Sequence, residues 1–169
     1  MEGALTPSRK GAIAEAAITA EAARLGLDVY RPVIEGCRCD LVLGICGQLL
    51  RIQCKWSRRH GDVVRVMIRT SRHTPAGYVQ TKYTAEEIDA VVAYCPDVPG
   101  CYFLPISMVA GRNCVYLRLA PTKNSQAARI QWARHHEFSG AIAQLGERLA
   151  GSQKVAGSSP ASSTQLRLD

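Results

Sequence analysis

Three polar residues with the types and spacing needed for phosphodiester chemistry lie in the segment CDLVLGICGQLLRIQCKW, residues 39–56. Cys46-Gly47 separates two alternating runs in this segment, which predicts a hairpin with a two-residue turn. In the resulting register Asp40 lies opposite Gln53, and Lys55 follows two residues further along the same face. A carboxylate, an amide oxygen and an ammonium group placed in this way suit binding of a divalent cation and hydrolysis of a phosphodiester.

The opposite face of the predicted hairpin is apolar. Leu41 faces Ile52 and Leu43 faces Leu50, and these pairs share one side with Ile45 and Cys54. Such a face is expected to be part of the core, whatever the polar face does. The polar residues also fit a second interpretation, a solvated hairpin surface without chemistry, because half-solvated hairpins alternate in this way routinely.

If the polar face binds a metal, its chemistry favours Mg²⁺, which prefers oxygen ligands and keeps several waters. Asp40 is the expected main ligand, with the Gln53 amide oxygen and the Cys54 carbonyl beside it. Glu15 is expected to reach the same site from a first helix through a metal-bound water. Lys55 is expected to orient or deprotonate water and to offset phosphate charge. Mn²⁺ is expected to substitute for Mg²⁺.

The elements that must position these residues can be predicted from capping and periodicity. Thr6-Pro7-Ser8 predicts a helix over residues 9–25, stopped by Gly26. A Thr84-x-x-Glu87 capping box predicts a short helical turn after a loop rich in Gly, Pro and Thr. The predicted apolar face of the first helix consists of Ile13, Ala16, Ala17, Ala20 and Ala23. Further strands are predicted at residues 27–32, 62–69, 89–94, 101–106 and 115–119, and a closing helix at 124–138. This order predicts an α/β fold, a mixed central β-sheet flanked by helices.

Composition favours an intracellular partner that is a polyanion. The 169 residues are 47% hydrophobic with a formal net charge of +7, and no apolar run approaches the length of a membrane span. We therefore expect a cytoplasmic protein with nucleic acid as its partner and no membrane partner. The arginines that continue from the hairpin are expected to contact DNA phosphates or guanine edges, although they also fit a solubilising surface. These expected DNA-binding residues are Arg58, Arg59, Arg65, Arg69 and Arg72.

The seven cysteines have two interpretations. Cys37, Cys39, Cys46 and Cys54 are imaginable as a zinc site, but they lack the C-x(2–4)-C spacing that structural zinc sites usually show. Buried or strand cysteines that stay reduced in the cytoplasm fit the spacing better.

Beyond these residues, the chain as a whole resembles the PD-(D/E)XK nuclease superfamily and, more narrowly, its group I intron homing endonucleases. The resemblance rests on GAIAE, DLV, IQCK, YTAEEID and VYLRL and covers residues 10–138. It implies a restriction-endonuclease-like core of order α-β-β-β-α-β in a domain over residues 1–139. It assigns the family's helix glutamate to Glu15, its metal aspartate to Asp40 and its lysine to Lys55. Cys39 replaces the usual proline and Gln53 the usual acid, which leaves fewer anionic ligands.

Three functions are compatible with these residues. The first is a Mg²⁺-dependent, site-specific double-strand DNA endonuclease of homing type, and the resemblance implies a homo-oligomer, a dimer or tetramer, because two strands must be cut. The second is a structure-selective nuclease such as a Holliday junction resolvase. The third is a decayed relative that only binds DNA.

Residues 140–169 are rich in Gly, Ser, Ala and Gln, which predicts a disordered tail. The same stretch is compatible with a translated tRNA gene. Codons exist that write residues 142–148 as a tRNA D-arm and residues 154–160 as a variable loop and T-arm, and the span from Gly140 to Ser163 has the coding length of a tRNA. An alanine tRNA fits best. We therefore expect the reading frame to enter a tRNA gene and the cleavage target to lie in one.

Overall fold

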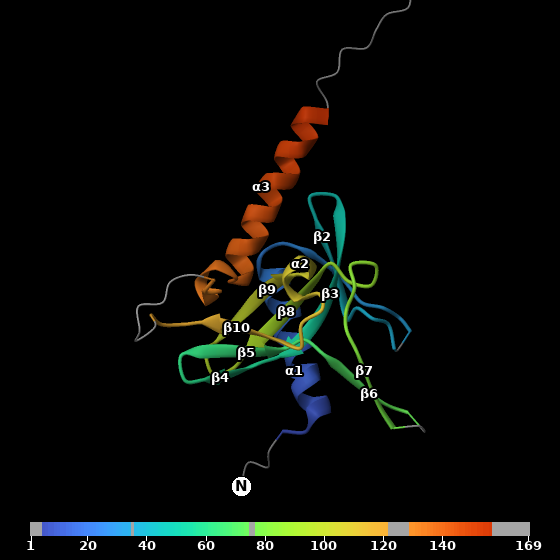
Figure 1. Ribbon diagram of the computed structural model, residues 1–169. Coiled ribbons are helices and arrows are strands. Elements are labelled where there is room, and N and C mark those ends of the chain that lie inside the picture. Colours follow the sequence, from blue (N-terminus) through green and yellow to red (C-terminus); the bar gives the residue numbers. More distant parts are fainter. Residues whose placement is uncertain (1–4, 35, 75–76, 122–128, 157–169) are drawn as a thin grey trace, which may run out of the picture.

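The computed structural model of the chain describes residues 5–34, 36–74, 77–121 and 129–156 (Figure 1). Its centre is a mixed five-stranded sheet in the order β1-β2-β3-β8-β9, in which β3 and β8 run parallel and the other neighbours antiparallel. The strands are β1 (Asp28–Tyr30), β2 (Leu41–Ile45), β3 (Gln48–Trp56), β8 (Ala90–Cys95) and β9 (Gly100–Pro105). The α/β class expected from the sequence is confirmed.

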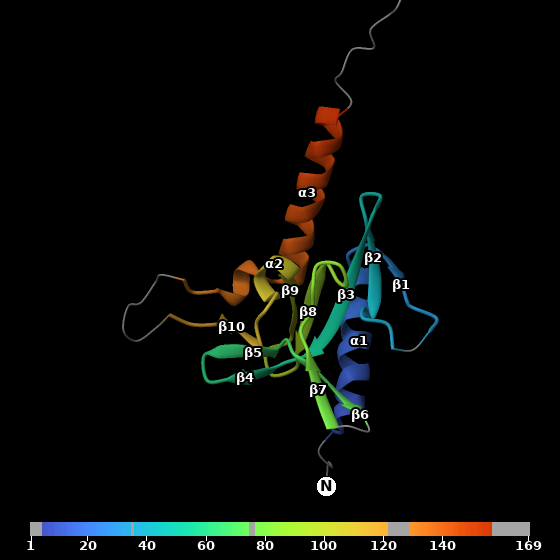
Figure 2. The same ribbon diagram turned by 45° about the vertical axis from the view of Figure 1, so that its right-hand side comes forward.

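Helix α1 (Pro7–Arg24) packs against β3 and β8, and Figure 2 shows it running beside β3. The Thr6 hydroxyl caps it by accepting from the Arg9 N–H over 3.3 Å. The face that it buries differs from the predicted one: Ala14, Ile18 and Ala22 are fully buried, whereas Ile13 is 38% exposed. An alanine-rich helix has little amphipathic contrast, so the large Ile18 and its neighbours one turn away decide which face packs on the sheet.

The β2–β3 hairpin has the predicted register. Leu41 pairs with Ile52 and Leu43 with Leu50. Cys46 and Gly47 both have positive φ angles, 48° and 77°, as a two-residue turn between twisted strands requires. The apolar face of the hairpin packs beneath α1 in a core completed by side chains of β8, β9 and the last helix.

Two smaller sheets extend from the end of β3. Ser57 is buried and donates both its N–H and its hydroxyl to the Tyr94 carbonyl, where the chain leaves the central sheet. The three-stranded sheet has the order β10-β5-β4 and the two-stranded sheet pairs β6 with β7. These strands are β4 (Arg58–His60), β5 (Val63–Met67), β6 (Thr70–Thr74), β7 (Gly77–Thr81) and β10 (Cys114–Arg118). The segment predicted as a Gly-, Pro- and Thr-rich loop thus contains two paired strands.

The turn before β8 holds β3 against the start of that strand. The Thr84 N–H donates to the Glu87 carboxylate over 3.1 Å, which is one half of the predicted capping box, but the segment forms a hydrogen-bonded turn and no helix. Arg51 of β3 binds both carboxylate oxygens of Asp89, at 3.0 and 2.9 Å. The short helix α2 (Ile106–Val109) follows β9 instead.

The end of the described chain departs most from expectation. Of the closing helix predicted at residues 124–138, residues 124–128 lie outside the described part, and the remainder includes the 3₁₀ turn η1 (Ala133–His135). Helix α3 (Phe138–Ala156) begins only where the tail was expected. Phe138 stacks on Phe103, and Ile142 is buried in the core under α1. The apolar residues Phe138, Ile142, Leu145 and Leu149 recur at helical spacing, which explains why this Gly- and Ser-containing segment folds. In the described residues, no helix is both long and apolar enough to cross a membrane.

Candidate active site

Asp40 lies at the start of β2, where strand pairing fixes its backbone and hydrogen bonds fix its carboxylate. Its N–H donates to the Ile52 carbonyl over 2.8 Å. Its Oδ2 accepts from the Cys54 N–H at 2.7 Å and from the Gln53 side-chain amide. The predicted hairpin register therefore brings Asp40, Gln53 and Cys54 together at one point.

The orientation of the Gln53 amide differs from the sequence expectation. The expected group beside Asp40 was the amide oxygen, but the Nε2 group faces the carboxylate and lies 3.4 Å from the Cys54 carbonyl. A carboxylate only accepts hydrogen bonds, so it is the donor end of the amide that contacts Asp40. Rotation of the amide exchanges its oxygen for its nitrogen with almost no change of shape.

The Asp40 carboxyl is partly withdrawn from water, and its surroundings disfavour its negative charge. Burial is the main cause that raises its pKa, and repulsion from Glu15 raises it further. The Cys54 N–H, the Lys55 ammonium and the Gln53 amide act in the opposite direction but do not cancel the effect. A cation at this point would relieve the cost of the charge.

Glu15 and Asp40 line the same open pocket, which has a volume of about 410 Å³ and a rim formed by the segment between β1 and β2. Glu15 projects from α1, and its carboxylate lies 3.7 Å from the Arg31 guanidinium. Arg31 is in turn held by the Thr19 hydroxyl at 3.3 Å. The helix glutamate and the strand aspartate predicted for one site are thus brought to one pocket.

Lys55 follows Gln53 by two residues in β3, and its surroundings favour its neutral form. Burial lowers its pKa, and the nearby Arg38 guanidinium lowers it further, while Asp40 and Cys54 oppose the shift. The Lys55 Nζ lies 5.2 Å from the centre of the Tyr83 ring, and Arg38 stacks over the same ring at 4.8 Å. Tyr83 is only 4% exposed.

The second cation on the Tyr83 ring is itself held in place. Arg38 makes a two-pronged contact with the Glu87 carboxylate, at 2.9 and 3.0 Å. This contact is the main cause that lowers the pKa of Glu87. Sequence reasoning did not identify Tyr83, Arg38 or Glu87 as parts of the site. Glu87 was visible only as a capping residue, and no spacing along the chain links Tyr83 to Lys55.

The donor set fits a hard divalent cation better than zinc. In the described part of the chain, no three His, Cys, Asp or Glu side chains gather closely enough to hold a metal by themselves. All seven cysteines are free, and burial raises the pKa of the Cys54 thiol, which keeps its sulfur a poor ligand. The oxygen donors at hand are the carboxylates of Asp40 and Glu15, the Cys54 carbonyl and, after rotation, the Gln53 amide. Oxygen donors of this kind suit Mg²⁺.

The predicted DNA-binding arginines do not form one cluster. Arg58 and Arg65 face each other across β4 and β5 and line a basic pocket of about 340 Å³ with Trp56. Arg59 turns back, and its Nε donates to the Gly61 carbonyl over 2.7 Å. Arg69 is exposed beyond the end of β5, and Arg72 lies in β6.

Comparison with known proteins agrees with this arrangement. Residues 5–139 match the sequence pattern of the family described as PD-(D/E)XK endonuclease. The fold resembles the solved structure of the bacterial homing endonuclease I-Ssp6803I, with a TM-score of 0.69 and 23% sequence identity over 88% of this chain and 99% of that one. No curated protein matches the chain. Because the matched pattern spans most of the chain, including the strands and the helix that carry Glu15, Asp40, Gln53 and Lys55, the protein belongs to the PD-(D/E)XK endonuclease family.

Proposed function

We propose that the protein is a divalent-metal-dependent endonuclease of homing type that cuts double-stranded DNA at specific sites. One observation carries this proposal: the Asp40 carboxylate, fixed by Cys54 and Gln53, shares a pocket with Glu15 and sits beside Lys55. A partly buried anion next to a second carboxylate favours a cation, and the family supplies the reaction class.

In this proposal Asp40, Glu15, the Gln53 amide oxygen and the Cys54 carbonyl would hold Mg²⁺, with Mn²⁺ as a substitute. The ion would supply Lewis-acid polarisation of the scissile phosphate. The supporting feature is a donor set made of oxygen atoms, two of them from carboxylates. The network around Asp40 keeps its carboxylate in one orientation before DNA binds.

Lys55 would orient or deprotonate the attacking water and offset charge on the phosphate. Its lowered pKa supports this role, because an ammonium group in such surroundings gives up its proton more readily than an exposed lysine. Arg58 and Arg65 are the best placed of the predicted arginines to contact the DNA backbone, since they lie in register just beyond the end of β3. Arg59, Arg69 and Arg72 remain candidates on the same segment.

The proposed target is a tRNA gene. The support for it is the compatibility of residues 140–163 with a translated tRNA, an alanine tRNA fitting best. A homo-oligomer, a dimer or tetramer, is part of the proposal because each copy offers one candidate site and a duplex has two strands to cut.

The alternative is a relative that binds DNA without cutting it. Gln53 favours this second function, because an amide replaces the acid that the family usually has beside Asp40, so the site has one anionic ligand fewer. This second function would be established if the protein cleaved no substrate and if Asp40→Ala left DNA binding unchanged.

The test is Mg²⁺-dependent cleavage of a plasmid that carries the uninterrupted tRNA gene, compared with the same plasmid without it. Asp40→Ala and Lys55→Ala are expected to lower the cleavage rate by about 100-fold or more. Glu147→Ala is the control, because Glu147 is exposed on α3 away from the pocket.

The outcomes separate the hypotheses. Cleavage at one site of the tRNA plasmid, lost in both variants and kept in the control, supports the proposal. Cleavage of a four-way junction alone would make the protein a structure-selective nuclease. Cleavage that survives Asp40→Ala would place the chemistry elsewhere in the chain.

A further inference from the structure

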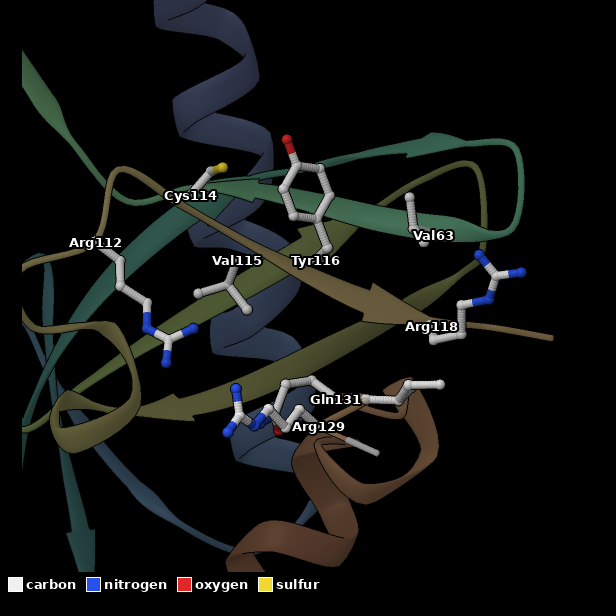
Figure 3. Close-up of a pocket in the computed structure, with 9 residues that line it drawn as sticks. Val63, Arg112, Cys114, Val115, Tyr116, Arg118, Arg129 and Gln131 are labelled. Carbon is white, nitrogen blue, oxygen red and sulfur yellow. The ribbon is translucent and has the colours of Figure 1, made fainter. Parts of the chain in front are cut away.

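A second pocket, of about 300 Å³, lies along β10 and reaches Val63 at the start of β5 (Figure 3). β10 is an edge strand of its sheet, and the chain returns along it just before α3. There the Arg118 N–H donates to the Gln131 carbonyl over 2.7 Å, and Arg118 forms an isolated bridge with Trp132. The pocket therefore lies between β10 and this returning segment.

Three arginines line the pocket, and among the described residues two of them have no acidic partner. Arg118 has partners: the Asp62 carboxylate at 3.6 Å and the Ala120 carbonyl at 2.7 Å. Arg112 and Arg129 are exposed, and neither makes a side-chain hydrogen bond or ion pair with any residue that the structure describes. Figure 3 shows the guanidinium groups of Arg112 and Arg129 turned into the pocket from opposite sides.

The backbone places one of these arginines in an unusual conformation. Arg129 has a φ angle of 60°, a left-handed conformation that residues with a side chain rarely adopt. The neighbouring Gln131 is fixed both by its backbone contact to Arg118 and by a 3.1 Å contact of its side chain with His136. The segment thus places Arg129 at the edge of the pocket that it lines.

The outward face of the same sheet links this pocket to the predicted DNA-contacting arginines. Arg58, Arg65 and Tyr116 lie in one row across β4, β5 and β10. Tyr116 is 51% exposed and lines the arginine pocket, whereas Arg65 and Arg58 line the basic pocket beyond β3. An exposed row of arginines with an aromatic ring is the pattern of a surface that follows a nucleic-acid backbone.

We propose that Arg112 and Arg129 form a phosphate-binding site, and that its ligand is a backbone phosphate of the DNA, held at a distance from the cleavage position. Unpaired guanidinium groups that converge on one open pocket bind phosphate oxygens in two-pronged contacts. The identity of the ligand as DNA rests on the proposed function, whereas the affinity for a phosphate group does not. The site would anchor the duplex without reading its sequence.

The test compares two double variants of the full chain that lose the same charge. Arg112→Gln with Arg129→Gln removes the pocket arginines. Arg9→Gln with Arg148→Gln removes two exposed arginines from α1 and α3, where they make no side-chain contact that the described residues show. Binding to a fluorescent duplex is measured by anisotropy at several salt concentrations in EDTA, so that no DNA is cut.

The double variant that lacks Arg112 and Arg129, here the pocket pair, is expected to bind the duplex about tenfold more weakly. The slope of log K against log salt is expected to fall by about 1 to 2, because each phosphate contact contributes about 0.9. The double variant that lacks Arg9 and Arg148, here the control pair, is expected to bind the duplex within about twofold of the affinity of the unmodified protein. An equal loss in both pairs would overturn the proposal, since only net charge would then matter.

A second measurement separates DNA from free phosphate. Inorganic phosphate, compared with chloride at equal ionic strength, is expected to raise the Tm of the unmodified protein and of the control pair but not of the pocket pair. If phosphate acts in this way while DNA binding is the same in both pairs, the ligand is a free phosphate and the DNA assignment is overturned.

The cleavage assay distinguishes failure of this inference from failure of the proposed function. If the protein cuts DNA and the pocket pair binds and cuts like the control, the phosphate site alone is refuted. If the protein cuts no substrate but the pocket pair still lowers the salt slope, the phosphate site stands and the nuclease proposal fails.

Discussion

The ammonium group of Lys55 lies 5.2 Å from the centre of the Tyr83 ring, so a buried aromatic face supports the one lysine of the candidate active site. The Arg38 guanidinium lies over the same ring, 4.8 Å from its centre, and donates two hydrogen bonds to the Glu87 carboxylate. The ring stabilises the charged form of Lys55, while burial and Arg38 act against it. Tyr83 is therefore a positioning residue whose effect should be visible in the titration of Lys55.

The first prediction concerns the ring itself. Tyr83→Leu is expected to remove about 1 kcal/mol of cation–π interaction from the ammonium form of Lys55, which corresponds to about a fivefold change in the acid dissociation constant of that group. Because the ring favours the ammonium form, its loss lowers the pKa of Lys55, and the limb of the pH–rate profile that reports Lys55 moves to lower pH. Tyr83→Phe keeps the ring and is expected to stay within about twofold. A purely structural role would lower the Tm of the leucine variant and leave the pH profile in place.

The second prediction concerns stability and pH. Burial and repulsion from Glu15 raise the pKa of Asp40, so the folded chain binds that proton more tightly than the unfolded chain. This contribution to stability is complete below the unfolded pKa of about 3.9 and is lost as pH rises through the folded pKa. We therefore expect Asp40→Asn to be more stable than the natural chain at pH 7 and equally stable below about pH 4.

Urea unfolding at several pH values in EDTA measures this difference. Asp28→Asn is the control, because Asp28 is an exposed aspartate of β1. An Asp40→Asn variant that is less stable than the natural chain at pH 7 would mean that the Cys54 and Gln53 contacts outweigh the burial of the charge.

The hairpin shows how far local pattern determines this fold. Alternation on both sides of Cys46-Gly47 was enough to predict the pairing of Leu41 with Ile52 and, with it, the meeting of Asp40 and Gln53. Turn geometry and a one-sided apolar face leave a hairpin a single register, because a shift by one residue would bury its polar side chains. The part of the site within the hairpin was therefore accessible from the sequence.

The parts that were missed depend on contacts between distant segments. The buried face of α1 was predicted wrongly because alanines surround the helix, and only packing against β3 and β8 selects Ile18 over Ile13. The contact between Lys55 and Tyr83 joins the end of β3 to the turn before β8 and has no local signal. Helix α3 was missed because the Gly-, Ser- and Ala-rich composition of this segment is typical of a tail, whereas the apolar spacing of Phe138 and Ile142 is typical of a helix.

The third prediction tests whether α3 contributes to the fold. Ile142 is 7% exposed and packs in the core under α1, so Ile142→Ala is expected to lower the free energy of unfolding by about 2–4 kcal/mol. Gln144→Ala on the exposed side of the same helix is expected to change it by less than about 0.5 kcal/mol. Urea denaturation measures both. Equal stability of the two variants would mean that α3 does not contribute to the stability of the fold.

The fourth prediction concerns the amide that stands where the family usually has an acid. Gln53→Glu brings a second carboxylate against the Asp40 oxygen that now accepts from the Gln53 amide. Without metal the two charges repel, which lowers the Tm at neutral pH and raises the pKa of the pair. With Mg²⁺ or Mn²⁺ the added anionic ligand is expected to tighten binding of the metal ion about tenfold, because ligand charge sets the affinity of such sites.

Thermal unfolding against metal concentration measures both effects. Gln53→Ala is the control: it loses the amide without adding a charge, and it is expected to bind metal no better than the natural chain. If Gln53→Glu responds to metal as Gln53→Ala does, residue 53 lies outside the ligand set, and Asp40 and Glu15 must hold the ion without it.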